Sequence, residues 1–147
     1  MFRTAPWEAT LDEIEQALFE AAMGVRENSH APYSGFQVGA AILADDGNIY
    51  AGCNVENAAY PIGHCAEASA IAAMLAGGGR RIRCILTLGN GREPVTPCGG
   101  CRQRIREFAD AHVSVICRAI EGGEALHTTL GELLPHSFGP EFLENGK

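Results

Sequence analysis

Three consecutive segments predict the architecture of this chain: IRCILTL (residues 82–88), CGGCRQRIREFA (98–109) and VSVICRAI (113–120). The first and third segments are short apolar runs, which is typical of buried strands. The segment between them has apolar residues at helical spacing, and Ile105 and Phe108 are expected to point inward. Two strands joined through a helix are usually parallel, with a right-handed crossover. These residues therefore predict an α/β arrangement.

The same alternation continues outward in both directions. Thr10 and Glu13 form a capping-box pattern that predicts the start of a helix. A hairpin is expected from residues 36–44 and 49–55, and a helix from residues 65–76. A last strand is expected at residues 125–130, followed by an irregular or briefly helical tail at residues 131–143. We expect one three-layer α/β domain over residues 1–147, with a central mixed sheet of about five strands flanked by helices.

The composition restricts the classes of function. The 147 residues are 46% hydrophobic and 20% charged, and the formal net charge is -7. A globular core is therefore expected, and a polynucleotide partner is disfavoured because nucleic-acid binding needs a basic surface. The sequence has neither a signal-peptide pattern nor an apolar stretch long enough for a bilayer span. We expect a cytoplasmic protein with no membrane partner.

The six cysteines include three that form a chemical pattern. Cys65-Ala66-Glu67 is followed by Pro97-Cys98-Gly99-Gly100-Cys101, and each segment begins an expected helix. Three thiolates leave the fourth position of a tetrahedral zinc open, which is typical of catalytic rather than structural zinc. A glutamate two residues after one ligand could move protons at that position without binding the metal.

Other interpretations exist for these residues. Cys98 and Cys101 alone could be a redox pair or half of a structural zinc site. A non-catalytic zinc module would place a fourth protein ligand on the metal. His64 is more plausible as a neighbour of the site than as a ligand. The remaining cysteines lie in expected strands and fit simple apolar packing, at Cys53, Cys84 and Cys117.

With these segments the chain resembles the small, zinc-dependent cytidine deaminases. Its C-x-E and P-C-x-x-C segments match the zinc-deaminase signature. The matching stretches cover most of the chain, at residues 31–41, 52–61, 65–67, 97–103 and 133–141. The resemblance implies that Cys65, Cys98 and Cys101 bind one Zn²⁺ per subunit and that Glu67 is the catalytic proton carrier.

The resemblance also implies a substrate site. It assigns the ribose hydroxyls to Asn54 and Glu56, whose amide and carboxylate suit a vicinal diol. It further implies that Phe36 lies beside the base and that Ala66, between Cys65 and Glu67, contacts the substrate. Two aromatics, Tyr60 and Phe138, are implied to reach the site of a neighbouring subunit. A homotetramer is the implied assembly.

The implied reaction is hydrolytic deamination of free cytidine or 2′-deoxycytidine to the uridine product, with release of ammonia, as in pyrimidine salvage. The alternative is deamination of a modified nucleoside or a nucleoside antibiotic. One residue departs from the family pattern, because many short members have arginine after the catalytic glutamate and this chain has Ala68. We expect the helix N-termini, with His64 or Arg102, to offset the thiolate charge instead.

Overall fold

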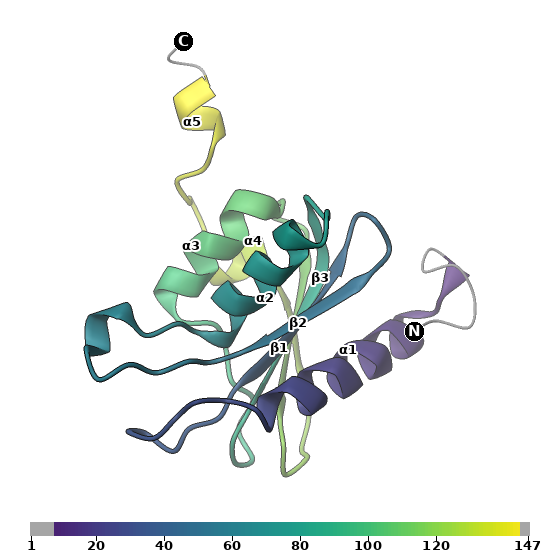
Figure 1. The fold of residues 1–147 in the computed structure, drawn as a ribbon. Helices are drawn as coiled ribbons and strands as arrows, with labels where there is room; N and C mark the ends of the chain where they lie inside the picture. Colours follow the sequence, from purple (N-terminus) through teal and green to yellow (C-terminus); the bar gives the residue numbers. More distant parts are fainter. Residues whose placement is uncertain (1–7, 145–147) are drawn as a thin grey trace.

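The computed structural model describes residues 8–144, in which five strands form one mixed sheet with the order β2-β1-β3-β4-β5 (Figure 1). The strands are β1 (Gly39–Ala44), β2 (Ile49–Cys53), β3 (Ile82–Gly89), β4 (Ser114–Ala119) and β5 (Leu126–Thr129). β3 and β4 are parallel, and the other neighbouring pairs are antiparallel. The predicted mixed sheet and the parallel pair are confirmed.

Helices cover both faces of this sheet, which gives the predicted three layers (Figure 1). The α-helices are α1 (Leu11–Arg26), α2 (Ala66–Ala76), α3 (Gly99–Phe108), α4 (Leu130–Leu133) and α5 (Glu141–Glu144), and η2 (Tyr60–Ile62) is a short 3-10 helix. α1 lies against one face, whereas α2 and α3 lie against the other. Thr10 and Glu13 form the predicted capping box at the N-terminus of α1. No helix within residues 8–144 has the length and apolar character needed to cross a membrane.

The core consists of two apolar layers, because successive strand residues point to opposite faces. In β3, Ile85 packs with Met74 of α2 in one layer, while Leu86 packs with Leu18 of α1 in the other. All four side chains are fully buried. β3 is therefore apolar on both sides, as the continuous run at residues 82–88 predicted.

The hairpin strands are shorter than predicted, and the difference has a physical cause. β1 begins at Gly39 rather than at Phe36, and β2 ends at Cys53. At residues 36–38, hydrogen bonds from the Asn54 side chain replace regular backbone pairing between strands. Its Oδ1 accepts from the Val38 N–H at 2.8 Å, and its Nδ2 donates to the Phe36 carbonyl at 2.8 Å. Residues 36–38 are thus held in place without regular strand pairing.

A close approach between β2 and α2 depends on Gly52. A β-carbon at this position would lie 2.4 Å from the backbone nitrogen of Ala70 and 2.6 Å from the carbonyl carbon of Ser69. Only glycine lets the helix pack this near to the strand. Since α2 begins beside Cys65 and Glu67, this contact sets the position of both.

Candidate active site

Three cysteine sulfurs from two segments of the chain lie together at the N-terminal ends of α2 and α3. Cys65 is the N-cap of α2 and Cys98 is the N-cap of α3, while Cys101 is buried in the first turn of α3. The Sγ atoms of Cys65 and Cys98 are 3.9 Å apart, and all three Sγ atoms lie within 4.8 Å of one another. The partial positive charge of two helix N-termini favours anionic thiolates here.

The cysteine cluster fits a zinc ion. Tetrahedral Zn–S bonds of about 2.3 Å place two ligand sulfurs about 3.8 Å apart, close to the 3.9 Å between Cys65 and Cys98. Within residues 8–144, this metal-competent group contains no fourth histidine, cysteine or carboxylate. Three sulfur donors suit a zinc site with one open position rather than a closed structural site.

The cysteines perturb one another's ionisation. Hydrogen bonds from Cys101 and Cys98, together with the charges of Arg104 and His64, lower the pKa of Cys65 to about 6 against the opposing effect of burial. Donation to Cys65 and burial raise the pKa of Cys101. The cluster therefore already favours one thiolate, the form in which cysteine binds metal.

Glu67 lies in the first turn of α2 and is only 4% exposed. Burial raises the pKa of Glu67, and the nearby Cys65 thiolate adds to the increase, whereas its own backbone N–H, the Cys101 thiol and Arg104 act in the opposite direction. A carboxyl group whose pKa moves toward neutrality is suited to accept and return a proton. Its position beside the sulfurs is the one that the C-x-E spacing predicted.

A cavity of about 400 Å³ opens onto this cluster. Its walls include Cys65, Cys98 and Glu67 together with Asn54 and Glu56. Phe36 and Ala66, two other predicted substrate-site residues, also line it, together with Val95 and Thr96, which sequence reasoning did not single out. The cavity falls within the size range of small-molecule sites.

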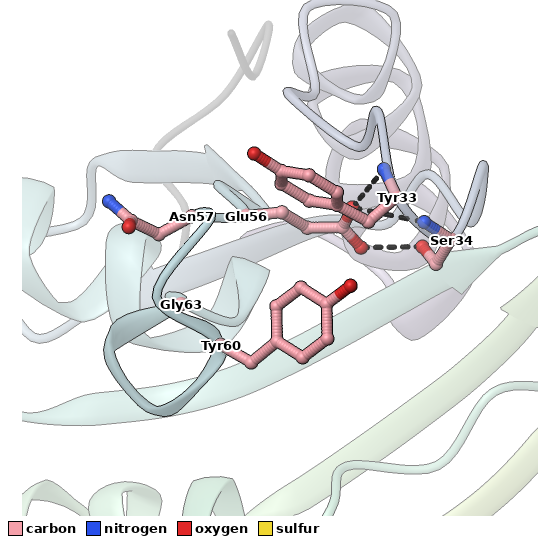
Figure 2. Close-up of a pocket in the computed structure, with 6 residues that line it drawn as sticks. All are labelled: Tyr33, Ser34, Glu56, Asn57, Tyr60 and Gly63. Carbon is pink, nitrogen blue, oxygen red and sulfur yellow. Dashed lines mark hydrogen bonds between the residues drawn. The ribbon is translucent and has the colours of Figure 1, made fainter.

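Glu56 is fixed at the mouth of this cavity by the loop before β1. Its carboxylate accepts hydrogen bonds from the backbone N–H groups of Tyr33, at 2.9 Å, and Ser34, at 3.1 Å, and from the Ser34 hydroxyl (Figure 2). The Ser34 hydroxyl bond is the main cause that lowers the pKa of Glu56. Glu56 therefore presents a fixed, ionised acceptor rather than a free surface acid.

Tyr60 lies in an adjoining pocket rather than in the cysteine cavity. This pocket of about 350 Å³ is shared by Tyr33, Ser34, Glu56 and Tyr60, among others (Figure 2). The Tyr33 and Tyr60 rings make an edge contact with centroids 5.5 Å apart, yet Tyr60 remains 73% exposed. Within one chain, Tyr60 thus borders Glu56 without lining the cavity that contains Glu67.

Phe138, like Tyr60, is a predicted site residue that does not line this cavity. It lies in the tail between α4 and α5, stacks on Phe142 with ring centroids 5.3 Å apart, and is 56% exposed. Figure 1 shows α5 projecting beyond α3, away from the sheet. The tail is anchored to α3 by Gln103, whose Nε2 donates to the Phe138 carbonyl at 2.9 Å, and by Arg106, which donates to the Ser137 hydroxyl at 2.8 Å and pairs with Glu141.

Arg102 is held by two backbone carbonyls. Its Nε donates to the Pro97 carbonyl and its Nη1 to the Leu133 carbonyl, both at 2.8 Å, so that it ties the loop before α3 to α4. Arg104 contacts the cluster instead, with its Nη1 3.9 Å from Cys101 Sγ. Of the two residues expected to offset the thiolate charge, His64 does act on Cys65 by its charge, whereas Arg102 bonds backbone carbonyls. The i, i+3 spacing between Cys101 and Arg104 on one helix was a signal that could have found this contact.

A second arginine missed by sequence reasoning supports the cavity wall. Arg26, at the end of α1, is buried, donates to the Gln37 carbonyl at 3.1 Å and bonds Asn90 Oδ1. Asn90 in turn donates to the Gly35 carbonyl at 3.1 Å. These bonds fix the segment on both sides of Phe36.

Comparisons with known proteins agree with this site. Residues 12–117 match the family described as the cytidine and deoxycytidylate deaminase zinc-binding region. The cytidine deaminase of Sporosarcina psychrophila is 40% identical over 131 residues, covering 89% of this chain and 95% of that protein. The cytidine deaminase of Halalkalibacterium halodurans is 39% identical over 126 residues, covering 86% and 95%.

Solved structures show the same fold. A cytidine deaminase from Burkholderia pseudomallei superposes with a TM-score of 0.79 at 42% identity, covering 84% of this chain and 98% of that one. A cytidine deaminase from Mycobacterium tuberculosis gives a TM-score of 0.74 at 33% identity, covering 85% of this chain and 97% of that one.

The fold and the cysteine site define a zinc-binding deaminase. The chain belongs to the cytidine and deoxycytidylate deaminase family.

Proposed function

We propose that this protein is a cytidine deaminase that converts free cytidine and 2′-deoxycytidine, with water, to uridine or 2′-deoxyuridine and ammonia. One observation carries the proposal: the buried Glu67 shares one cavity with Cys65 and Cys98 of the three-cysteine cluster and with Asn54 and Glu56. The cavity joins a proton-transfer site to groups that suit a sugar diol.

Cys65, Cys98 and Cys101 are the proposed ligands of one Zn²⁺. When bound, zinc with an open position supplies a water-derived nucleophile near neutral pH. Glu67 is the proposed proton carrier: its carboxylate takes one proton from the attacking water and delivers it to N3 of the cytosine ring. It then takes the second proton from the new C4 hydroxyl and delivers it to the amino group, so that the C4–N bond breaks, ammonia leaves and a C4 carbonyl remains. Burial supports this role because it brings the pKa of Glu67 closer to the working pH.

The other residues are proposed to bind and orient the nucleoside. Glu56 accepts from a ribose hydroxyl while the loop bonds hold its carboxylate in place. The Asn54 amide, already bonded to Phe36 and Val38, retains one N–H and one lone pair for the sugar. The Phe36 ring and Ala66, which line the cavity, contact the base.

We also propose a homotetramer in which Tyr60 and Phe138 complete the site of a neighbouring subunit. The support is exposure, because large apolar side chains are rarely left uncovered in a group. The exposed set near η2 and in the tail comprises Tyr60, Ile62, Phe138, Phe142 and Leu143. We place the protein in the cytoplasm, where a reducing environment would keep the six free cysteines reduced.

The function is tested with purified protein in an absorbance assay on cytidine, 2′-deoxycytidine, adenosine and a single-stranded cytosine oligonucleotide. We expect turnover of the two pyrimidine nucleosides only, and loss of turnover after zinc is removed by a chelator. Turnover that survives complete zinc removal, or activity on the oligonucleotide but not on cytidine, would contradict the proposal. A panel of modified cytosine nucleosides that outperformed cytidine would favour the alternative substrate class.

A further inference from the structure

The charge of the cysteine cluster calls for a nearby cation. Three thiolates on Zn²⁺ leave a net charge of about -1, and the residue that follows Glu67 is the uncharged Ala68. Arg102 is engaged with two backbone carbonyls. The guanidinium that does reach a sulfur belongs to Arg104, whose Nη1 is 3.9 Å from Cys101 Sγ, within hydrogen-bond range for sulfur.

The local backbone leaves room for this contact. Arg104 is three residues after Cys101 on α3, so both side chains lie on one side of the helix. A β-carbon added at Gly100 would lie 3.1 Å from Arg104 Nη1 and 4.0 Å from Cys98 Sγ. The guanidinium therefore occupies the space beside the first turn that the missing side chain of Gly100 leaves open.

We propose that Arg104 is a positioning residue for the metal site, which acts through Cys101 by donating to its sulfur and offsetting the thiolate charge. This inference rests on the proposed zinc site but assigns a residue that the site's ligand pattern does not include. The guanidinium places a donor and a positive charge beside the Cys101 sulfur, where the zinc-bound cluster carries its excess negative charge. Its role is to retain zinc, not to contact the nucleoside.

The first test measures zinc affinity by competition with a chromophoric chelator, without any substrate. Arg104→Ala should weaken zinc binding about tenfold, at the low end of the effect of outer-shell partners because Arg104 is exposed. Arg104→Lys should recover part of the loss. Arg83→Ala is the matched control, since it removes an equal charge from an exposed position at the start of β3 and should bind zinc like the wild type.

A spectroscopic readout separates this role from a general effect on folding. In the Co²⁺-substituted protein, loss of a hydrogen bond to Cys101 makes its thiolate a stronger electron donor. The sulfur-to-cobalt charge-transfer band should then move to longer wavelength in Arg104→Ala and not in Arg83→Ala. Unchanged zinc affinity and an unchanged band in Arg104→Ala would overturn the inference while leaving the proposed function intact. A wild-type protein that binds no zinc would overturn both.

Two glycine variants test the geometry. Gly100→Ala should displace the guanidinium and weaken zinc binding, whereas Gly99→Ala, whose β-carbon meets nothing within 4 Å, should not. Alanine is the better helix former at either position, so helix destabilisation cannot explain a difference between them. In the Arg104→Ala background, Gly100→Ala should add nothing. Equal zinc affinity in the two glycine variants, or a full Gly100→Ala effect without Arg104, would contradict the assignment.

Discussion

The Sγ atoms of Cys65 and Cys98 lie 3.9 Å apart, although 33 positions separate the two residues in the chain. Each residue is the N-cap of a helix, and the two helices cover the same face of the sheet. The packing of both helices on the sheet therefore brings the two sulfurs to one place. The substitutions that follow test what this arrangement does.

Loss of one thiolate should abolish stable zinc binding. Cys98→Ser removes an exposed member of the cluster and should leave the purified protein with less than about a tenth of the wild-type zinc, because a two-sulfur site is a much weaker ligand set. Metal analysis after dialysis measures this directly. Cys84→Ala is the control, since Cys84 is buried in β3 in the core layer that packs on α1. Full zinc content in Cys98→Ser would rule out Cys98 as a ligand.

Glu56 should act through the sugar and in its ionised form. Glu56→Gln should lower kcat/KM for cytidine by about 10- to 100-fold, the range for a lost hydrogen bond to a charged group. The defect should shrink for 2′,3′-dideoxycytidine, which lacks the hydroxyls that Glu56 is proposed to hold. An equal fall in kcat/KM for both nucleosides would mean that Glu56 only holds the loop in place and does not bind the sugar hydroxyls.

The pH dependence of this Glu56 effect follows from the direction of its pKa shift. Folding lowers the pKa of Glu56, mainly through the Ser34 hydroxyl. The ionised carboxylate therefore contributes to stability above its unfolded-state pKa, and the contribution is lost as the pH falls through the lowered folded-state pKa. The ratio of wild-type to Glu56→Gln activity should thus stay constant between about pH 6 and pH 8. A ratio that changes across this window would contradict the assigned ionisation state.

The packing of α2 on β2 should be sensitive to one methyl group. Gly52→Ala places a β-carbon 2.4 Å from the Ala70 nitrogen, so the helix must shift, at a cost of about 1–3 kcal/mol in the free energy of unfolding. Denaturant unfolding measures the loss, and activity should fall as well because α2 carries Glu67. Gly24→Ala, on α1, meets nothing within 4 Å and should be neutral or slightly stabilising. Equal stability of both variants would argue against the close contact.

The oligomer should depend on the exposed aromatics of the tail. Phe138→Ala removes a 56% exposed ring and should shift the mass measured by light scattering toward smaller species at low protein concentration. Leu11→Ala provides the control, because Leu11 is 84% exposed at the start of α1, far from the tail (Figure 1). A wild-type protein that is monomeric at all concentrations would contradict the proposed assembly.

Sequence reasoning reached the parts of the fold that depend on local patterns. The strand–helix–strand unit over residues 82–120 was predictable because apolar periodicity and strand–helix–strand chirality constrain it strongly. The Cys65, Cys98 and Cys101 group was predictable because the residue types and their places at helix starts carry the metal chemistry.

The features that sequence reasoning missed depend on tertiary contacts. The early end of the hairpin pairing at Phe36–Val38 follows from hydrogen bonds of the Asn54 side chain. The Arg104 contact depends on the conformation of a long side chain and on the space beside Gly100. The first could not be read from periodicity or from a motif, whereas for the second the i, i+3 spacing of Cys101 and Arg104 indicates only that the two side chains can meet. The roles of Tyr60 and Phe138 depend on a second subunit and remain predictions.

Glu67 is proposed to move the proton in a zinc-dependent deamination of cytidine. The most direct measurement compares the wild type with Glu67→Gln, determining the zinc content and the rate of cytidine conversion on the same samples. We predict about one zinc per chain in both proteins and a fall in turnover of about 10²- to 10⁴-fold in the variant. A zinc-loaded Glu67→Gln protein that converts cytidine at close to the wild-type rate would contradict the account.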